Sequence, residues 1–339
     1  MKNSNLVKLQ KNRSTLNEKL IFLAGATGMA GTSILVHILN NYPGAKVRAS
    51  YYKNTRPFIK NERVDYVDGD LTSLEDCKRM ASGCDCAVMA AAYTGGAGII
   101  RSFPWRHIKE NLLMNTQMIE AFQLENIKRV IYIGSATLYQ EFEGSIKEDE
   151  LDLNKDPNQA YLGFGWVVRF IEKLCKFLYE QNGMEIVVAR VANIFGPYAK
   201  FDPKTSNFIP AIIRKAIDKM DPFEVWGSPD VIRDVIYSDD FARAIVMMLD
   251  NGNVKFDVFN VGSGVKVSVG EVVNLALKYA GHTPKEVKYI QDKPTTMNFR
   301  ALDCTKIKNT LGWQAQNTVE EGIRKTTEWW FENKGRWNK

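Results

Sequence analysis

The amino-acid sequence predicts an α/β fold, with a doubly wound parallel sheet and a smaller, less regular C-terminal lobe. The first observation is that strand-like apolar runs alternate with helix-like segments from residue 21 to residue 193, as in a parallel sheet with helices on both faces. The second is that the regular alternation of strand-like and helix-like segments ends after Gly196 and Pro197. Beyond that point the elements are shorter, and prolines punctuate them at residues 203, 210, 222 and 229.

A glycine-rich turn follows the first predicted strand. Apolar residues 21–24 lead into Gly25, Gly28 and Gly31, and a helical apolar pattern over residues 34–39 comes next. A strand that turns sharply into a helix leaves backbone N–H groups at the helix start, where glycine lets a pyrophosphate approach and the helix dipole favours its charge. The segment therefore predicts a Rossmann-type sheet that binds a dinucleotide. The alternative is a glycine-rich turn in another kind of α/β protein.

Further strands and helices follow this turn in regular alternation. Their order is the one expected when each parallel strand is joined to the next by a crossover helix. The predicted strands cover residues 46–52, 63–70, 86–92, 129–136 and 185–193, and the predicted helices cover 73–81, 105–125 and 162–181.

The end of this regular alternation also divides the chain into regions. Residues 1–19 are polar and basic without an apolar signal core, so we expect an N-terminal extension rather than a secretory signal. Segments near 233–262 are expected to return to the main sheet. The predicted dinucleotide-binding domain is therefore 20–195 with 233–262, and the predicted second lobe is 196–232 with 263–339.

The composition of the chain indicates which kinds of binding partner to expect. The chain has 339 residues, of which 45% are hydrophobic and 25% charged, which is ordinary for a soluble globular protein. Its net charge of +6 is spread along the chain without a basic stripe interleaved with aromatic residues, so no nucleic acid is expected. No apolar run reaches membrane-spanning length, and we expect a cytoplasmic protein without a membrane partner. The five scattered cysteines and three unclustered histidines predict reduced thiols and no metal site.

Seven motifs that occur in order along the chain resemble a known family. They are similar to those of extended short-chain dehydrogenases/reductases that act on nucleotide sugars, in the NAD-dependent epimerase/dehydratase group, and most of all to GDP-fucose synthases. The individual motifs are loose, but their order and spacing over about three hundred residues are specific. They read GATGMAG (25–31), VDGDLTS (67–73), AAAYTGG (90–96), IGSATLY (133–139), NIFGP (193–197), VWGSPDVIRDVIYSDD (225–240) and LDCTKIKNTLGW (302–313).

The resemblance implies a set of residues that contact the cofactor. Asp70 and Leu71 match a motif that contacts the adenine, although Asp70 is also suited to a plain turn. Three alanines at the end of the fourth strand are expected to line the nicotinamide ribose, with core packing as the alternative. The three alanines are Ala90, Ala91 and Ala92. The pyrophosphate of the cofactor is expected to lie against Thr27, Gly28, Met29 and Ala30.

The choice of cofactor depends on the end of the second predicted strand. An acidic residue near position 50 would bind the ribose 2′-hydroxyl and exclude a 2′-phosphate. The sequence instead offers basic and hydroxyl-bearing residues, which favours NADP over NAD. The alternative is an exposed loop that is basic for other reasons. The residues concerned are Arg48, Ser50, Tyr51, Tyr52, Lys53 and Arg56.

The catalytic positions are where the sequence departs from the family. The family uses a Ser or Thr at the fifth strand, and a Tyr followed four residues later by a Lys that lowers the pKa of that Tyr. Ser135 and Thr137 match the hydroxyl positions, whereas Phe164 and Val168 occupy the Tyr and Lys positions. Three readings stay open: an inactivated variant, an enzyme that recruits another acid/base, and a binding protein without chemistry. Candidates for another acid/base are Tyr161, Tyr139 and Tyr93.

The resemblance also bears on the substrate. GDP-fucose synthases use a Cys and a His to move protons during a double epimerisation, and Thr137 and Tyr198 occupy those two positions, so that reaction is disfavoured. A GDP-sugar is the favoured substrate, and a homodimer formed through the helices at 105–125 and 162–181 is expected. The expected sugar-nucleotide contacts are Asn193, Asn207, Phe208, Ile209, Val225, Trp226, Gly227, Arg233 and Arg300.

Overall fold

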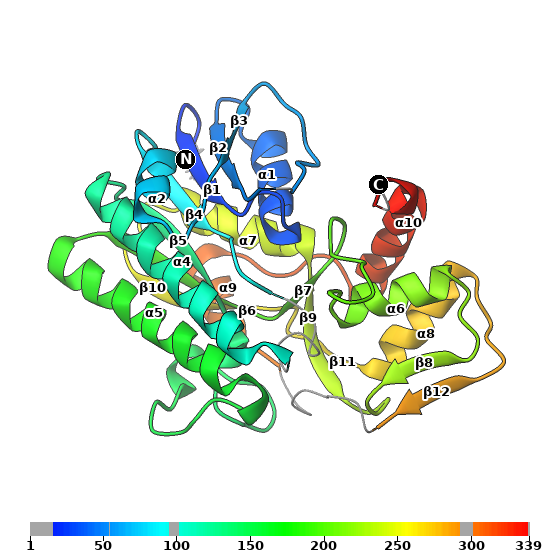
Figure 1. The fold of residues 1–339 in the computed structure, drawn as a ribbon. Helices are drawn as coiled ribbons and strands as arrows, with labels where there is room; N and C mark the ends of the chain where they lie inside the picture. The colour runs from blue at the N-terminus through cyan, green and yellow to red at the C-terminus, as the bar shows by residue number, and fades with distance from the viewer. Residues whose placement is uncertain (1–15, 54, 95–101, 292–300, 338–339) are drawn as a thin grey trace, which may run out of the picture.

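The computed structural model describes residues 16–53, 55–94, 102–291 and 301–337. Its centre is a sheet of seven parallel strands in the order β10-β6-β5-β4-β1-β2-β3. This confirms the predicted doubly wound sheet (Figure 1). The strands are β1 (Leu20–Ala24), β2 (Lys46–Tyr51), β3 (Val64–Asp68), β4 (Cys86–Met89), β5 (Arg129–Ser135), β6 (Glu185–Val191) and β10 (Asp257–Val261).

The order of the strands reverses at β1. This strand pairs with β2 on one side and with β4 on the other. In an open parallel sheet, the crevice for a ligand lies beyond the carboxyl ends of the strands at such a switch point. The glycine-rich turn that follows β1 is therefore at the place where this architecture forms a site.

Helices cover both faces of the sheet. Alternate side chains of β1 point to opposite faces, so that Ile21 and Leu23 join one core and Phe22 and Ala24 join the other. The first face is covered by α1 (Met29–Asn41) and α7 (Ser238–Asp250), and the second by α2 (Leu74–Ala81), α4 (Pro104–Leu124) and α5 (Leu162–Asn182).

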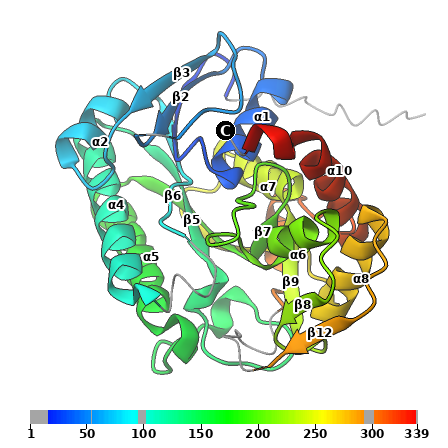
Figure 2. The same ribbon diagram turned by 45° about the vertical axis from the view of Figure 1, so that its right-hand side comes forward.

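A second lobe lies beside the carboxyl ends of the strands (Figure 2). It contains a three-stranded and a two-stranded sheet with helices packed around them. The rings of Phe201 and Trp330 stack in its core with centroids 4.0 Å apart. Its elements are β7 (Asn193–Phe195), β9 (Ile232–Tyr237), β11 (Lys266–Ser268), β8 (Phe223–Trp226), β12 (Val287–Ile290), α6 (Phe208–Ile217), α8 (Val269–Ala280) and α10 (Val319–Trp337).

The structure differs from the sequence-based expectation at two strands. The predicted strand 185–193 is two strands, because β6 ends at Val191 and β7 pairs with β9 in the second lobe. Of the segment 233–262, β10 joins the large sheet and α7 covers it, whereas β9 lies in the three-stranded sheet. The crossing between lobes therefore occurs at Ala192, whose N–H donates to the carbonyl of Val261. The exact domain boundaries stay a prediction.

Among the residues that the structure describes, none of the helices combines the length and apolar character needed to cross a bilayer.

A buried ion pair joins α5 to β6. Arg190 donates from Nε to Glu172 Oε2 over 2.9 Å and from Nη2 to Glu172 Oε1 over 2.6 Å. The same guanidinium donates to the hydroxyl of Tyr139 over 2.7 Å, and that hydroxyl donates to Asn260 Oδ1 over 2.8 Å. These bonds connect α5, β6, β10 and the segment after β5. All four side chains are buried, so each depends on the others for its partners.

We expect Glu172→Ala to lower the free energy of unfolding by about 3–5 kcal/mol, because it leaves the Arg190 guanidinium buried without its carboxylate. Urea denaturation followed by circular dichroism measures this. The matched control is Glu180→Ala, which removes the exposed partner of Lys176 on the same helix and should cost less than about 1 kcal/mol. Equal losses in the two variants would contradict the assignment.

Candidate functional site

The three glycines of the turn after β1 have different roles. Gly25 has a φ of +75°, and a Cβ there would lie 2.6 Å from the Cα of Ala91. A Cβ at Gly31 would lie 2.3 Å from the carbonyl oxygen of Gly25. Both positions therefore require glycine for packing. Gly28 is exposed and has room for a Cβ, so packing alone does not explain its glycine.

The start of α1 is open to a ligand. Gly28 is its N-cap, no side chain caps it, and its first turn contains no acidic residue. The first N–H groups of a helix have no partner within the helix, and they carry the positive end of its dipole. Such an end binds a phosphate or another anion. Thr27, Met29 and Ala30 are partly exposed around it, as the sequence-based assignment requires.

The end of β2 holds the turn in place. Gly25 N donates to Ser50 Oγ over 3.1 Å, and Ala26 N donates to the Ser50 carbonyl over 3.0 Å. Tyr51 is partly exposed at the end of the strand, and Lys53 is exposed beyond it. This end of β2 therefore leaves side chains next to the open start of α1.

Arg48 is turned away from that region. Its Nη1 donates to the carbonyl of Ser82 over 2.6 Å and to that of Met80 over 3.3 Å, at the C-terminal end of α2. Its Nε lies 3.4 Å from Asp65 Oδ2. Ser82 precedes β4, so the guanidinium lies toward the amino ends of the strands. The expectation that Arg48 contacts the cofactor is therefore corrected. Its guanidinium instead binds carbonyl groups at the C-terminal end of α2.

Two further cofactor assignments fall on residues with structural contacts. Asp70 Oδ1 accepts from the N–H and the hydroxyl of Thr72, over 2.9 and 2.7 Å, and Leu71 is buried in the core. Asp70 therefore stabilises a turn, which is the alternative role given for it in the sequence analysis. Of the three alanines, Ala90 and Ala91 pack against the two cores, and Ala92 is exposed.

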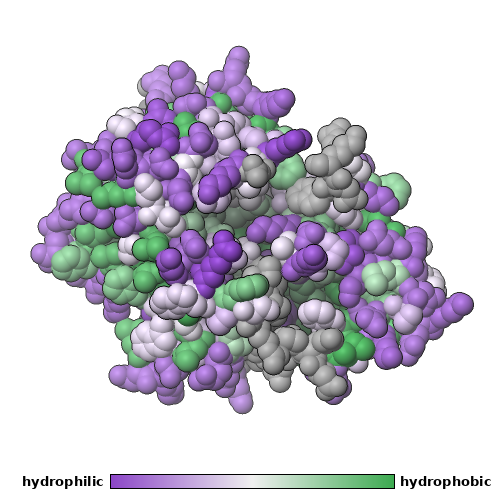
Figure 3. Space-filling view, in the orientation of Figure 1, coloured by the Kyte–Doolittle hydropathy of each residue, from purple (hydrophilic) through white to green (hydrophobic). Residues whose placement is uncertain are grey.

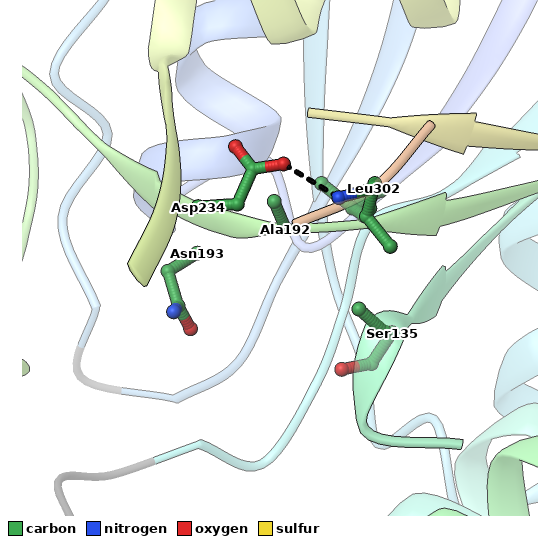
Figure 4. A pocket seen from close by; sticks show the side chains of 7 residues that line it. Ser135, Ala192, Asn193, Asp234 and Leu302 are labelled. Carbon is green, nitrogen blue, oxygen red and sulfur yellow. Dashed lines mark hydrogen bonds between the residues drawn. The ribbon is translucent and has the colours of Figure 1, made fainter. Parts of the chain in front are cut away.

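Ser135 and Thr137 come together at the end of β5. The hydroxyl of Thr137 donates to that of Ser135 over 3.0 Å. Ser135 lines a small cavity at the junction of the two lobes, together with Ala136, Val191, Ala192, Asn193, Asp234 and Leu302. Figure 4 shows the Ser135 hydroxyl and the Asn193 amide pointing away from the Asp234 carboxylate.

The two positions expected to hold Tyr and Lys lie in the first two turns of α5. Val168 is 1% exposed and packs with Leu138, Tyr139 and Ile146. The ring of Phe164 lies 4.5 Å from the ring of His107. Burial lowers the pKa of His107, so that side chain favours its neutral form. Sequence reasoning missed His107, because nothing in its spacing links α4 to Phe164.

The structure separates the alternative acid/base candidates. Tyr139 is excluded, because it is fully buried, its hydroxyl is bonded to Asn260 and Arg190, and burial raises its pKa. Tyr161 is the N-cap of α5 and is partly exposed.

Tyr93 and Tyr198 have ring contacts of their own. The ring of Tyr93 lies 6.5 Å from that of His107. Tyr198 packs against Phe58 and Trp329, at 5.1 and 5.2 Å between centroids, and burial raises its pKa.

Asp234 is a buried carboxylate that joins three segments. Its Oδ1 accepts from Ser263 N and Oγ over 3.0 and 2.9 Å, and its Oδ2 accepts from Leu302 N over 3.0 Å. Burial raises the pKa of Asp234 to about 6, against the hydrogen bonds that lower it. Its neighbour Arg233 has a pKa lowered by burial, an effect opposed by Tyr161. Sequence reasoning singled out Arg233 and weighed Asp234 only as an ion-pair partner for it, although both lie in the motif at 225–240.

The remaining sugar-nucleotide candidates lie in the second lobe. Asn207 is the N-cap of α6 without a side-chain cap bond, followed by Phe208 and the buried Ile209. Trp226 is 48% exposed at the end of β8, between the buried Val225 and Gly227. Of this set, the cavity at Ser135 includes only Asn193. Arg300 lies outside the described residues. No group of His, Cys, Asp or Glu within the described ranges could hold a metal ion.

We expect Asp234 to make stability depend on pH. Its folded-state pKa of about 6 lies above the ordinary 3.8, so the folded protein holds this proton to a higher pH than the unfolded chain. Its contribution to the free energy of unfolding therefore falls as pH rises from about 4 to about 6, by on the order of 1–3 kcal/mol.

Urea unfolding of wild type and Asp234→Asn at several pH values measures this contribution as the difference between them. The exposed Asp230→Asn is the control. A difference between wild type and Asp234→Asn that stays constant with pH would contradict the raised pKa.

Comparison with known proteins identifies the family of this chain. Residues 21–262 match the NAD dependent epimerase/dehydratase family. The probable GDP-L-fucose synthase 1 of Oryza sativa subsp. japonica is 26% identical over 327 residues, covering 92% of each chain. The GDP-mannose 3,5-epimerase of Arabidopsis thaliana is 29% identical over 316 residues, covering 91% of this chain and 81% of that one.

Solved structures share the fold. The UDP-glucose 4-epimerase of Thermotoga maritima has a TM-score of 0.82 and 21% identity, covering 93% of this chain and 99% of that one. The dTDP-glucose 4,6-dehydratase of Streptomyces venezuelae, solved with NAD bound, has a TM-score of 0.81 and 19% identity, covering 94% and 98%. Because the family match spans well over half of the sequence, the chain belongs to the NAD dependent epimerase/dehydratase family.

Proposed function

We propose that the protein binds a nicotinamide dinucleotide and transfers hydride at a carbon of a nucleotide sugar, as an epimerase, dehydrogenase or reductase. The observation that carries this is the uncapped start of α1 at the switch point of the sheet. A pyrophosphate at that helix end would receive backbone N–H groups and the helix dipole. The family to which the chain belongs supports the nicotinamide cofactor.

A GDP-sugar is the proposed substrate class. Similar proteins that support it include a probable GDP-L-fucose synthase and a GDP-mannose 3,5-epimerase. Asn193 and Arg233 have the chemistry for a diphosphate, since an amide and a planar guanidinium both donate to phosphate oxygens. The uncapped start of α6 at Asn207 adds a second helix end that favours an anion. Trp226 offers an exposed ring for a nucleobase.

Hydride transfer at an alcohol carbon needs a group that takes or gives the hydroxyl proton. Phe164 cannot exchange a proton, and Val168 cannot supply a charge. Ser135 and Thr137 can hold the sugar hydroxyl by hydrogen bonds. Tyr161 is the proposed substitute, because it is partly exposed at the start of α5 and lies near enough to Arg233 to oppose the lowering of the pKa of that guanidinium by burial. The alternative is a protein that binds a nucleotide sugar and a dinucleotide without catalysing a reaction. The apolar side chains of Phe164 and Val168 favour this alternative.

If Phe164 and Val168 leave the chain without a working acid/base, the inactivation reading, we expect Phe164→Tyr combined with Val168→Lys to raise turnover by about 10²–10⁴-fold, because it returns a proton donor and the charge that tunes it. Consumption of NADPH or NADH, and mass spectrometry of GDP-hexoses, measure the rate. Each single change should recover less. The control is Phe170→Tyr, which adds a hydroxyl on the same helix at a site 52% exposed.

Two outcomes would contradict the inactivation reading. One is brisk turnover by the unmodified chain, after which loss of activity in Tyr161→Phe would assign the proton to Tyr161. The other is a double variant that folds and binds cofactor without gaining rate. Folding needs its own check by circular dichroism, since Val168 is buried and a lysine there introduces an ammonium among apolar side chains.

NADP is the proposed form of the cofactor. Lys53 and Arg56 are exposed in the loop after β2, where a 2′-phosphate would lie. We expect NADPH to bind more tightly than NADH, and the double change Lys53→Ala, Arg56→Ala to remove the preference, at about 1.5–3 kcal/mol. Calorimetry measures both affinities, with the exposed Lys60→Ala of the same loop as control. Equal affinities in the unmodified chain would overturn this preference.

A homodimer is the proposed assembly. Three large apolar side chains of α5 are exposed: Trp166 by 41%, Phe170 by 52% and Phe177 by 55%. Figure 3 shows hydrophobic residues gathered over α4 and α5, and exposed patches of this kind mark interfaces. Light scattering should give twice the monomer mass, and Phe170→Glu with Phe177→Glu should halve it. A monomer mass for the unmodified chain at micromolar concentration would contradict the proposal.

A further inference from the structure

The segment after β2 carries the two cations proposed for the 2′-phosphate, Lys53 and Arg56. Both are exposed. Long cationic side chains on a freely moving loop lose conformational freedom when they bind a phosphate, and this loss lowers the affinity. A segment that is already held in place avoids that loss for its backbone. The contacts that hold this segment therefore affect how tightly it can bind a 2′-phosphate.

One contact joins the segment to the glycine turn. The hydroxyl of Thr27, in the turn after β1, donates to the hydroxyl of Thr55 over 3.1 Å. The hydroxyl and the N–H of Thr55 both donate to the carbonyl of Tyr52, over 3.0 and 3.2 Å. The side chain of Thr55 thus connects the start of the segment to the turn where the proposed dinucleotide would place its pyrophosphate.

Lys53 lies within the turn that these bonds close. Its φ is +44°, which is uncommon for a residue with a side chain and persists where surrounding contacts impose it. Its ammonium lies 4.7 Å from the centroid of the Tyr52 ring, within the range of a cation–π contact. Neighbouring groups therefore place both the backbone and the charge of Lys53, and the Thr55 hydroxyl supplies one of the bonds that close the turn.

A second contact joins the segment to the second lobe. The ring of Phe58 lies 5.1 Å from that of Tyr198, which follows β7, and 6.4 Å from that of Trp329, in α10. The rings of Tyr198 and Trp329 are themselves 5.2 Å apart, and Figure 2 shows α10 reaching from the second lobe toward α1. Arg56 lies between Thr55 and Phe58 in the sequence, so the chain is held on both sides of it.

We propose that Thr55 and Phe58 are positioning residues for the choice of cofactor. They hold Lys53 and Arg56 where the 2′-phosphate of NADP would lie, Thr55 from the glycine turn and Phe58 from the second lobe. This inference rests on the proposed function, because it needs a dinucleotide on the glycine turn and a preference for NADP. NAD carries a hydroxyl in place of that phosphate, so it gains little from the two cations. Loss of either contact therefore weakens the binding of NADP and leaves that of NAD unchanged.

We expect Thr55→Val, which removes the hydroxyl and keeps the shape, to weaken NADPH binding about three- to tenfold while the Kd of NADH changes less than about twofold. Thr55→Ser returns the hydroxyl and should restore the affinity, and Phe58→Ala should act like Thr55→Val. Two matched controls should leave both affinities unchanged. They are Thr116→Val, whose hydroxyl donates to carbonyls of its own helix α4, and Phe331→Ala, an α10 ring that is 67% exposed.

The same changes in a Lys53→Ala, Arg56→Ala background separate positioning from direct contact with the phosphate. If Thr55 and Phe58 act through the two cations, their substitution in this background changes the Kd of NADPH no further. Calorimetry with the full chain measures every Kd, and circular dichroism checks that each variant is folded.

A loss of affinity for NADPH alone in Thr55→Val and Phe58→Ala, absent from the Lys53→Ala, Arg56→Ala background, supports the inference. Three results overturn it: no loss in either variant, an equal loss for NADPH and NADH, or a loss that persists without the two cations. If the unmodified chain binds NADH as tightly as NADPH, or binds neither, the proposed function fails instead, and this is seen before any variant is made.

Discussion

The close approach of the turn after β1 to its neighbours is the constraint on which the site depends. Gly31 lets α1 start directly against the carbonyl of Gly25, and Gly25 lets the turn touch the backbone at Ala91 after β4. Ser50 ties the same turn to β2. Because β1 lies between β4 and β2, three strand ends are fixed around one open helix start. A larger residue at Gly25 or Gly31 would separate them.

The second lobe is attached by a change of sheet at Ala192. The chain leaves the large sheet after β6 and enters the three-stranded sheet as β7, so Ser135 and Asn193 face the same cavity from different lobes. Asp234 strengthens this junction by accepting bonds from the segments after β10 and before α9 (Thr305–Leu311). Tyr198 and Lys200 follow β7 closely, so their contacts with Phe58 after β2 and with Thr94 after β4 are a consequence of the same change of sheet.

Local patterns in the sequence predicted the large sheet, its helices and the glycine turn, because those depend on periodicity and turn chemistry. The break of the strand at Ala192 was not predictable, since the apolar run continues through it while its hydrogen-bond partner is Val261, distant in sequence. Arg48 was misplaced for a similar reason: its position near the strand end suggests a phosphate, whereas its partners are carbonyls at the end of α2. His107 and Asp234 depend on tertiary burial that no spacing reports.

The most direct test of the account is a calorimetric titration of NADPH and NADH into the full chain and into Gly28→Glu. Gly28 has a φ of −83° and room for a Cβ, so this variant should keep the fold while placing a carboxylate at the open start of α1. The account predicts that the unmodified chain binds at least one of the two dinucleotides and that Gly28→Glu binds neither, because like charges then meet at the helix end. Failure of the unmodified chain to bind either one, or equal binding by both proteins, would contradict it.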